Sequence, residues 1–600
     1  MKQKNSEIEK MLKDMAEAGQ RVTKTYIDNL PSLIHSGKDL AESWRIFGTK
    51  MASEPEKSSS AIQNAYLNFY KKQIELWNEI NEHVQKGNAP IMSNGDKQFK
   101  SPEWNESPYY FYFIKQTYLL ASELFSNILE QADIDEKTKN KLKFYSQLFI
   151  DAMSPSNFFA TNPEALKLAQ QTGGESLKKG FRNLIHDMKQ GRITQTDFSA
   201  FEVGKNLAVT PGDVVFQNEL IQLIQYKPLT NKVSEIPLLL IPPWINRFYI
   251  LDLEPHNSFV RFAVEKGFTV FMISWRVPKG AMGKLSFDDY AQLGAMDAIA
   301  AIQEITGQKK VNALGYCIGG TLLGTVAAIF AAREKNGQAA KNKSQNKTNY
   351  KSPLNTATFL ATMLDFSDFG PLSAVVDFPL IEKMEKEIGK DGILKGSDMT
   401  NAFNMIRAKD LIWNYVANNY LKGNSPAPYS ILYWTNDNTN LPGKMYAYYL
   451  RHFILENKLS KKDMLTICGT PVDLGKIKNL CYVVGTVEDH ISPCNTTFAT
   501  TRLVGGEVEY ILGESGHVAG IVNPPPPHNG KYGFYCNGKL GNSLEHFKNT
   551  AEHHKETWWL HWSKWLKAHS GKQISAPKKT GGKKHKALEP APGSYVKEKM

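Results

Sequence analysis

VNALGYCIGGTLLGTVAAIFAA, residues 311–332, joins two apolar runs through a turn rich in glycine. The run VNALGY is typical of a short buried strand, and TLLGTVAAIFAA is typical of a buried helix. Cys317 lies between them in the pattern G-x-C-x-G, flanked by Gly315 and Gly319. Glycines at these positions let a strand and a helix approach without a side-chain clash. The stretch therefore predicts a sharp strand-to-helix turn that carries a thiol.

The rest of the chain indicates an α/β domain around this turn. From about residue 205 onward, short β-rich runs alternate with helices, which predicts a mostly parallel sheet. The helix before the turn is expected to begin at a capping box of Ser286 and Asp289 and to end at Gly307. The predicted strands are IPLLLI (236–241), FTVFMISW (268–275), VNALGY (311–316), ATFLATML (357–364), NLCYVVGT (479–486) and VEYIL (508–512).

Three other segments differ from this alternation. Residues 1–204 show helical periodicity, which predicts a helical N-terminal domain before a catalytic domain at 205–570. Between 366 and 440 aromatic and helical sequence replaces the strands, which predicts an inserted lid that covers Cys317. Residues 571–600 are basic and poor in apolar side chains, so we expect a flexible C-terminal tail.

The net charge of the 600-residue chain, +12, comes almost entirely from two stretches. Residues 333–351 carry six Lys or Arg and one Glu, and residues 572–600 carry eight Lys and two Glu, so together they supply +11. Both stretches lack the apolar side chains of a core. We interpret them as a solvated insert, disordered over 334–350, and a solvated tail, and we expect no nucleic-acid binding.

The cysteines and the N-terminus bear on compartment and cofactors. The five cysteines are odd in number and include no C-x-x-C pair, which disfavours a disulfide framework and a zinc site. No run of about 18 apolar residues occurs, and the N-terminus MKQKNSEIEKML lacks the apolar segment of a secretory signal. We therefore expect a cytoplasmic protein with no membrane span, no metal and no bound cofactor.

Chain order gives Cys317 two candidate partners. A G-x-C-x-G turn alone also fits a structural cysteine, but in α/β-hydrolases the nucleophile occupies such a turn, the acid follows a late strand and the histidine follows the last one. Here Asp489 follows NLCYVVGT in VEDHISP, and His517 follows VEYIL in GESGHVAG. The order of all three predicts a Cys–His–Asp triad on an α/β-hydrolase fold. His490 is interpreted as a neighbour of the triad.

From about residue 99 to the C-terminus the chain resembles the class I polyhydroxyalkanoate synthases, which polymerise 3-hydroxyacyl-CoA. The resemblance implies the family's nucleophilic cysteine at Cys317, its aspartate at Asp489 and its general-base histidine at His517. It also implies short substrates such as 3-hydroxybutyryl-CoA, a homodimer, and association with a cytoplasmic polymer granule. Residues 1–95 match the family little. The matching pieces are TPGDVVFQNELIQLIQY, LIPPWINRFYILDL, TVFMISWRVP, GYCIGGT, MLDFSDFG, DLIWNYVANNYLKGN, WTNDNTNLPG, VEDHISP and GESGHVAGIVNPP.

A thiol nucleophile suits polymerisation of a thioester. Attack of a thiolate on a thioester gives another thioester of similar free energy, so the acyl group stays activated for transfer to a hydroxyl. His517, oriented by Asp489, would deprotonate first Cys317 and then the 3-hydroxyl that attacks next. We expect the oxyanion to bind the Ile318 N–H and a second donor within Trp244–Asn246, with Asn246 as the candidate.

Two other function classes fit part of the sequence. A Cys-dependent hydrolase would use the same triad and pass the acyl group to water, although the insert at 366–440 favours a site closed to water. A granule-coat protein would account for the helical N-terminus and the basic tail but not for the triad. With (R)-3-hydroxybutyryl-CoA, a synthase releases CoA and insoluble polyester, a hydrolase releases CoA and a soluble hydroxy acid, and a coat protein releases neither.

Overall fold

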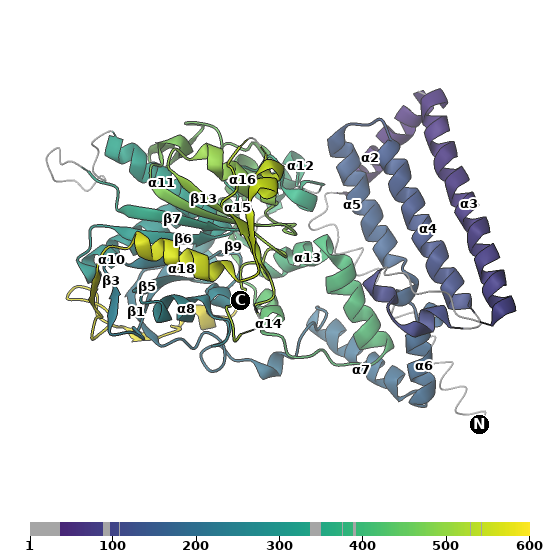
Figure 1. Cartoon of the computed structure of the whole chain (residues 1–600), viewed down its shortest axis with the longest axis horizontal. Helices are drawn as coiled ribbons and strands as arrows, with labels where there is room; N and C mark the ends of the chain where they lie inside the picture. The colour runs from purple at the N-terminus through teal and green to yellow at the C-terminus, as the bar shows by residue number, and fades with distance from the viewer. Residues whose placement is uncertain are drawn as a thin grey trace. The chain divides into compact units, whose positions relative to one another are not determined.

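A computed structural model describes residues 36–53, 55–87, 96–106, 109–335, 350–374, 376–387, 392–528, 530–541 and 543–600. The chain forms two compact units (Figure 1). The first contains Met1–Asp197, Ser373–Val375 and Asn401–Pro428, and the second contains Phe198–Leu372, Val376–Thr400 and Tyr429–Met600. The first boundary thus lies at Asp197 rather than at 204, and the segment at 366–440 is divided between the two units.

Among the described residues, the regular secondary structure of the first unit is helical, with loops between the helices. The segment 401–428 belongs to it because Trp413 and Tyr420 pack against Leu184 in a common apolar cluster. The buried Asp187 accepts a hydrogen bond of 2.7 Å from the Tyr420 hydroxyl. The helices are α2 (Ser36–Ser53), α3 (Pro55–Lys86), α4 (Tyr110–Gln131), α5 (Glu136–Ala152), α6 (Pro163–Gln171), α7 (Glu175–Gln190) and the π-helices η11 (Lys409–Trp413) and η12 (Val416–Leu421).

The second unit is built on one mixed sheet with eleven strands among the described residues, in the order β15-β14-β13-β12-β7-β6-β4-β5-β2-β1-β17. The six neighbouring strands from β13 to β5 are parallel, and they are the six strands that the sequence predicts. Both edges of the sheet are antiparallel and were not predicted. The strands are β1 (Gly212–Gln217), β2 (Ile221–Tyr226), β4 (Leu238–Ile241), β5 (Val270–Trp275), β6 (Val311–Tyr316), β7 (Leu354–Leu360), β12 (Leu480–Thr486), β13 (Val508–Gly513), β14 (Phe534–Cys536), β15 (Glu552–His554) and β17 (Glu589–Pro590).

Three short antiparallel pairs lie outside this sheet: β3 (Lys232–Ser234) with β16 (Gln573–Ser575), β8 (Ile393–Leu394) with β9 (Leu441–Pro442), and β10 (Leu465–Ile467) with β11 (Thr470–Val472). Strand β8 falls within the segment 366–440, where the sequence predicts no strand. Among the described residues, none of the helices combines the length and apolarity needed to cross a bilayer.

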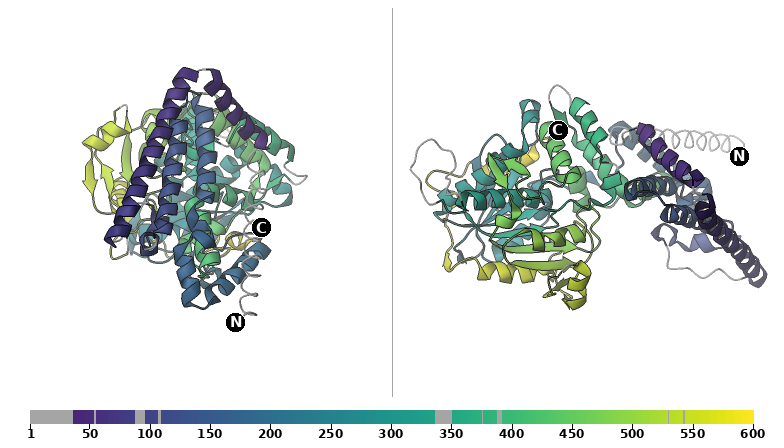
Figure 2. Two further views of the ribbon diagram at one scale, coloured as in Figure 1. Left: turned by 90° about the vertical axis from the view of Figure 1, so that its right-hand side faces the viewer. Right: turned by 90° about the horizontal axis from the view of Figure 1, so that it is seen from above.

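Helices cover both faces of the sheet (Figures 1 and 2). On one face, α8 (Phe259–Glu265) and α18 (Trp558–Ala568) pack Phe259 and Trp562 against Leu238 and Leu240 of β4. The predicted capping box of Ser286 and Asp289 is confirmed at α9, and Gly307 ends α10. The other helices are α9 (Phe287–Asp289), the π-helix η9 (Tyr290–Met296), α10 (Asp297–Thr306), α11 (Ile318–Lys335), α12 (Phe378–Glu387), α13 (Gly396–Ile406), α14 (Ser430–Asn436), α15 (Gly443–Tyr448), the π-helix η13 (Tyr449–Leu455), α16 (Cys494–Leu503) and α17 (Leu544–Thr550).

The C-terminal segment is ordered, which corrects the prediction of a flexible tail at 571–600. Strand β16 pairs with β3, and β17 adds an edge strand to β1. Tyr595 and Val596 are buried, and the Tyr595 N–H donates a hydrogen bond of 3.0 Å to the Gln222 side chain. Main-chain pairing with an exposed sheet edge and a few buried side chains order the segment, although its average composition is polar.

The basic insert begins later in the chain than predicted. Arg333 belongs to the last turn of α11, where its guanidinium donates hydrogen bonds to the Cys468 carbonyl (3.0 Å) and the Thr470 hydroxyl (3.2 Å). Its charge therefore belongs to the folded unit. Most of the stretch 334–350, for which the sequence predicts disorder, lies outside the described residues.

Candidate active site

Cys317 lies at the turn between β6 and α11, as the G-x-C-x-G pattern predicts. Its φ of 53° is in the left-handed region, which is uncommon for a residue with a side chain. The Cys317 N–H donates to the Leu360 carbonyl (2.9 Å), and the Cys317 carbonyl accepts from the Gly320 N–H (2.9 Å). Strained backbone that is held in this way is concentrated at functional sites.

The glycines of the turn leave no room for side chains. A Cβ atom at Gly319 would overlap the Ile241 carbonyl oxygen, and one at Gly315 would overlap the backbone of Gly320. A Cβ atom at Gly320 would overlap the Thr362 side chain. The requirement for Gly315 and Gly319 follows the sequence prediction, whereas Gly320 was missed because the G-x-C-x-G pattern does not include it.

The structure brings the three predicted site residues together. Asp489 follows β12, His517 follows β13, and His517 Nδ1 lies 2.7 Å from Asp489 Oδ2. The Cys317 sulfur acts on the same imidazole, and Nε2 is the ring nitrogen that Asp489 leaves free. Asp489 and His517 are each 7% exposed, and Cys317 is half-buried. A buried carboxylate, an imidazole and a thiol thus form one connected row.

Asp489 is fixed by its own loop. Its Oδ1 atom accepts hydrogen bonds from the N–H groups of Ile491 (2.9 Å) and Ser492 (2.8 Å). The Thr486 hydroxyl donates a weaker bond of 3.4 Å to Oδ2. These bonds compensate the buried negative charge and leave Oδ2 directed at the imidazole.

The charges around His517 favour its protonated form. Burial lowers the pKa of His517, but the negative charges of Asp489 and of the Cys317 sulfur, and hydrogen bonds to both, outweigh this effect and raise the pKa to about 10. The Cys317 sulfur and the Asp489 carboxylate therefore act together on the protonation of His517.

Two tyrosines that the sequence analysis missed are coupled to the triad. The Tyr316 ring stacks on His517 with centroids 5.5 Å apart, and its hydroxyl donates to the His517 carbonyl (3.1 Å). Tyr449 is buried, and burial, together with the charge of the Cys317 sulfur, raises its pKa. Tyr316 directly precedes the cysteine, and Tyr449 lies in the aromatic run MYAYYLRHF (445–453), just beyond the predicted lid.

The predicted oxyanion donors lie on two segments that meet at the turn. Ile318 is the first residue of α11, so its N–H has no partner within the helix. Asn246, in the loop after β4, forms an isolated β-bridge with Asn438, and its side-chain oxygen accepts from the Arg247 N–H (2.7 Å). Trp244 Nε1, in the same loop, is buried and has no hydrogen-bond partner among the described residues, so it is a second candidate donor.

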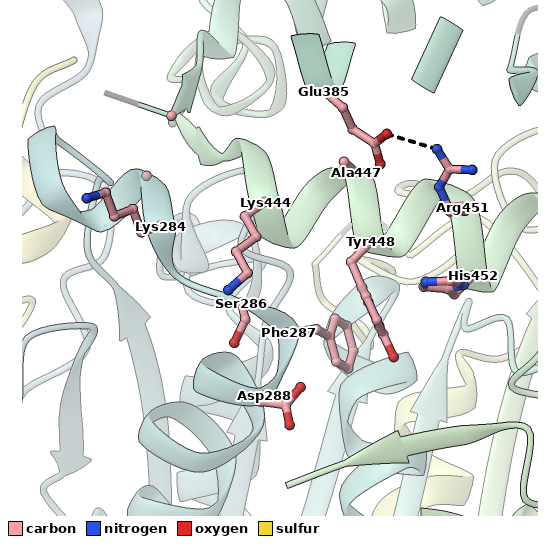
Figure 3. Close-up of a pocket in the computed structure, with 12 residues that line it drawn as sticks. Lys284, Ser286, Phe287, Asp288, Glu385, Lys444, Ala447, Tyr448, Arg451 and His452 are labelled. Atoms are coloured by element: carbon pink, nitrogen blue, oxygen red, sulfur yellow. Dashed lines mark hydrogen bonds and ion pairs between the residues drawn. The ribbon is translucent and has the colours of Figure 1, made fainter. Parts of the chain in front are cut away.

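A separate pocket of about 560 Å³ lies beside α15 and η13 (Figure 3). None of the predicted site residues lines it. Arg451 there pairs with Glu385 at 2.9 Å, and Lys284 and Lys444 add two further cations. Tyr448 also lines this pocket, and its ring packs against Phe287 with centroids 6.2 Å apart.

Two family models match the chain. The model described as "alpha/beta hydrolase fold" covers residues 237–524, and the model described as "Poly-beta-hydroxybutyrate polymerase (PhaC) N-terminus" covers residues 95–263. The parallel sheet, the strained turn and the first match define a protein of the α/β-hydrolase class that is preceded by a helical region. The predicted fold class is confirmed.

Curated relatives define the family more narrowly. Poly(3-hydroxyalkanoate) polymerase subunit PhaC of Cupriavidus necator is 42% identical over 90% of this chain and 88% of its own length. The enzyme named poly(3-hydroxyalkanoate) polymerase in Methylorubrum extorquens is 41% identical over 93% and 89%, and the Rhizobium etli PhaC subunit is 36% identical over 96% and 88%. The chain belongs to the poly(3-hydroxyalkanoate) polymerase family, as the resemblance in the sequence predicts.

Solved structures include more distant matches. The monoacylglycerol lipase of Paleococcus ferrophilus is 10% identical, with 58% of this chain and 99% of that chain covered and a TM-score of 0.31. A thermostable carboxyl esterase of Bacillus coagulans is 11% identical, with 50% and 89% covered and a TM-score of 0.30.

Proposed function

We propose that the chain polymerises (R)-3-hydroxyacyl-CoA, with 3-hydroxybutyryl-CoA as the expected substrate, into polyhydroxyalkanoate with release of CoA. The names of its relatives support the class of product. The observation that carries the proposal is the buried Asp489–His517 pair next to a thiol on a strained turn. In this acyltransferase, Cys317 is the nucleophile, His517 is the general base and Asp489 orients His517.

In the acylation step, His517 takes the proton of the Cys317 thiol, and the resulting thiolate attacks the thioester carbonyl of the substrate. A new carbon–sulfur bond forms to Cys317, and the bond between the acyl carbon and the CoA sulfur breaks. The leaving CoA thiolate takes the proton that His517 holds, so free CoA departs as a thiol and His517 becomes neutral. The product is an acyl thioester on Cys317.

Acylation prepares His517 for the next step. Once the sulfur is part of a thioester, it no longer carries the charge that raises the pKa of His517. The imidazole, left neutral by the departure of CoA, therefore stays neutral and is available to accept the proton of the 3-hydroxyl of an incoming unit. The hydroxyl oxygen attacks the thioester carbonyl, the bond to Cys317 breaks, and the ester joins two units while the Cys317 thiolate returns.

Each attack places negative charge on the carbonyl oxygen. We assign its stabilisation to the Ile318 N–H and to a donor of the loop after β4, either Asn246 or Trp244 Nε1. The buried Tyr449 near the sulfur supports a site from which water is largely excluded. That exclusion favours transfer of the acyl group to a hydroxyl over hydrolysis.

We further propose that the reaction needs no cofactor and no metal, since the triad supplies both the nucleophile and the base. We also propose a homodimer that remains attached to its growing polymer granule in the cytoplasm; the names of the relatives, which are polymerases, support the attachment to polymer. Cross-linking with and without substrate tests the dimer, and sedimentation of the enzyme with the polymer tests the attachment.

The alternative is a Cys-dependent hydrolase with the same triad. Incubation with (R)-3-hydroxybutyryl-CoA separates the two activities because both release CoA but only a polymerase forms insoluble polyester. We expect CoA release to be matched by ester bonds in the precipitate. Stoichiometric soluble 3-hydroxybutyrate in place of polymer would assign the triad to hydrolysis.

A further inference from the structure

Strands β14 and β15 bring three potential metal ligands to one face of the sheet edge. In their antiparallel register Cys536 lies opposite Glu552, and Phe534 lies opposite His554. Side chains alternate between the two faces along a strand, so Glu552 and His554 lie on the face that Cys536 occupies. These residues are far from C-x-x-C spacing in the sequence, which is why the cysteine pattern gives no sign of the cluster.

The ligand atoms of this cluster converge. The Cys536 sulfur, a Glu552 carboxylate oxygen and a His554 ring nitrogen all lie within 4.8 Å of one another. Among the described residues, no other group of three His, Cys, Asp or Glu side chains converges this closely. Small side-chain rotations would bring the three atoms to the distances of one metal ion.

The imidazole of His554 has an unused nitrogen in this cluster. Its Nε2 atom is buried and has no hydrogen-bond partner among the described residues. Glu552 Oε2 is 3.6 Å away, which allows an ion pair with a protonated ring but is beyond hydrogen-bond distance. The ring stacks on Phe534 with centroids 5.0 Å apart and an interplanar angle of 14°, so its plane is held by packing. A buried ring nitrogen without a hydrogen bond is costly unless something binds it.

The electrostatic surroundings favour a cation. Cys536 is 1% exposed, and a carboxylate oxygen of Glu552 lies within 4.8 Å of its sulfur. A divalent cation bound between the two would compensate the carboxylate charge and replace the thiol proton.

We propose that Cys536, Glu552 and His554 bind Zn²⁺. A thiolate, an imidazole and a carboxylate are the donors that Zn²⁺ prefers, with Zn–S of about 2.3 Å and Zn–N of about 2.0–2.1 Å. Binding forms the bond from the Cys536 sulfur to the metal and releases the thiol proton to solvent, while His554 binds through the neutral Nε2 lone pair. A water molecule completes the coordination.

The site is distinct from the triad and shares no residue with it. It links β14 to β15, the last strand at this edge of the sheet. Because the metal binds the folded hairpin and cross-links its strands, we expect it to stabilise the fold rather than to take part in catalysis.

Titration of the full-length protein with Co²⁺ tests the proposal. Tetrahedral Co²⁺ bound to a thiolate gives visible absorption and a sulfur-to-metal charge-transfer band. We expect one Co²⁺ per chain, displaced by Zn²⁺, with the charge-transfer band absent in Cys536→Ser and the affinity at least about tenfold weaker in His554→Gln. Cys481→Ser, at a buried thiol of β12, and Cys317→Ala should keep the full spectrum.

Stability measurements separate metal binding from folding defects. Zn²⁺ should raise the thermal unfolding midpoint of the wild type and of Cys481→Ser, but not that of Cys536→Ser or Glu552→Gln. The Glu552 side chain is 65% exposed, so Glu552→Gln should fold normally even if Cys536→Ser does not. A Co²⁺ spectrum that persists in Cys536→Ser, a spectrum lost in Cys317→Ala, or no binding to folded wild type would each overturn the proposal.

Discussion

His517 Nδ1 lies 2.7 Å from Asp489 Oδ2, and both side chains are buried. The N–H groups of Ile491 and Ser492 hold the Asp489 carboxylate in place. The carboxylate therefore determines the orientation of the His517 ring. The imidazole therefore presents its second nitrogen to Cys317. This hydrogen bond between Asp489 and His517 is the basis for separating the acylation step from the elongation step in the variants below.

Asp489→Asn should separate acylation from elongation. CoA is a good leaving group and the thiol is a fair nucleophile, so the first acylation of Cys317 should slow by less than about tenfold. A 3-hydroxyl is far less acidic and needs the oriented base, so polymerisation should fall by about 10²–10⁴-fold. Single-turnover acylation and steady-state polymer formation, measured side by side, check this. Equal slowing of both would show that Asp489 does not act selectively on the hydroxyl.

The pKa of His517 should depend on the sulfur. NMR of the protein with ¹³C-labelled histidine should show His517 titrating at about 10 in the wild type and at lower pH in Cys317→Ala, because the thiolate charge and its hydrogen bond are lost. Asp489→Asn should lower it as well. An unchanged titration in Cys317→Ala would mean that the sulfur does not control the base.

The same shift has a consequence for stability. The pKa of about 10 in the folded protein lies above the ordinary value of about 6.5. The contribution of protonated His517 to stability is therefore full below about pH 6.5 and is lost as pH rises through about 10. Unfolding of wild type and His517→Gln should differ most at pH 6 and converge toward pH 10. A difference that grows with pH would contradict this sign.

The strained turn should not tolerate a methyl group. In Gly319→Ala the new Cβ would overlap the Ile241 carbonyl, so we expect a loss of about 1–3 kcal/mol in stability and a strong loss of activity. The matched control is Gly48→Ala in helix α2, where a Cβ meets nothing within 4 Å. That variant should be neutral or slightly more stable. Chemical denaturation of both variants makes the comparison, and equal stability would disprove the packing argument.

The C-terminal segment should contribute to the fold. Tyr595→Ala removes a buried ring whose hydroxyl donates to the Asn218 carbonyl (2.7 Å), so we expect a loss of about 3 kcal/mol. Leu588→Ala, at a side chain that is 59% exposed, is the control and should have little effect. Thermal unfolding of the two variants checks this. If Tyr595→Ala and Leu588→Ala unfolded at the same temperature, the C-terminal segment would contribute little to the stability of the fold.

The sequence indicates those parts of the fold that have a strong local signal. The six parallel strands are short runs in which apolar side chains predominate, and the turn at Cys317 is marked by its glycines. Two of the edge strands are not marked in this way: β15, Glu552–His554, has no apolar residue, and β17 consists only of Glu589 and Pro590. Such strands form because a neighbouring edge offers main-chain partners, which composition does not reveal.

In the candidate site, too, the sequence reveals the residues that have a local signal and misses those that come together only in the folded chain. Chain order identifies Cys317, Asp489 and His517, because each follows a recognisable strand. The sequence does not reveal Tyr449, because Tyr449 is coupled to the Cys317 sulfur only in the folded chain. The sequence does not reveal the cluster of Cys536, Glu552 and His554 either, because strand register rather than sequence spacing brings these residues together.

The central claim is that Cys317 carries the acyl group as a thioester during polymer synthesis. The direct measurement is a rapid quench of the enzyme with labelled (R)-3-hydroxybutyryl-CoA, followed by proteolysis and mass spectrometry of the peptide that contains Cys317. We predict an acyl adduct on that peptide that neutral hydroxylamine removes, and neither adduct nor polymer with Cys317→Ala. Label on a different residue, or polymer made by Cys317→Ala at the wild-type rate, would contradict the account.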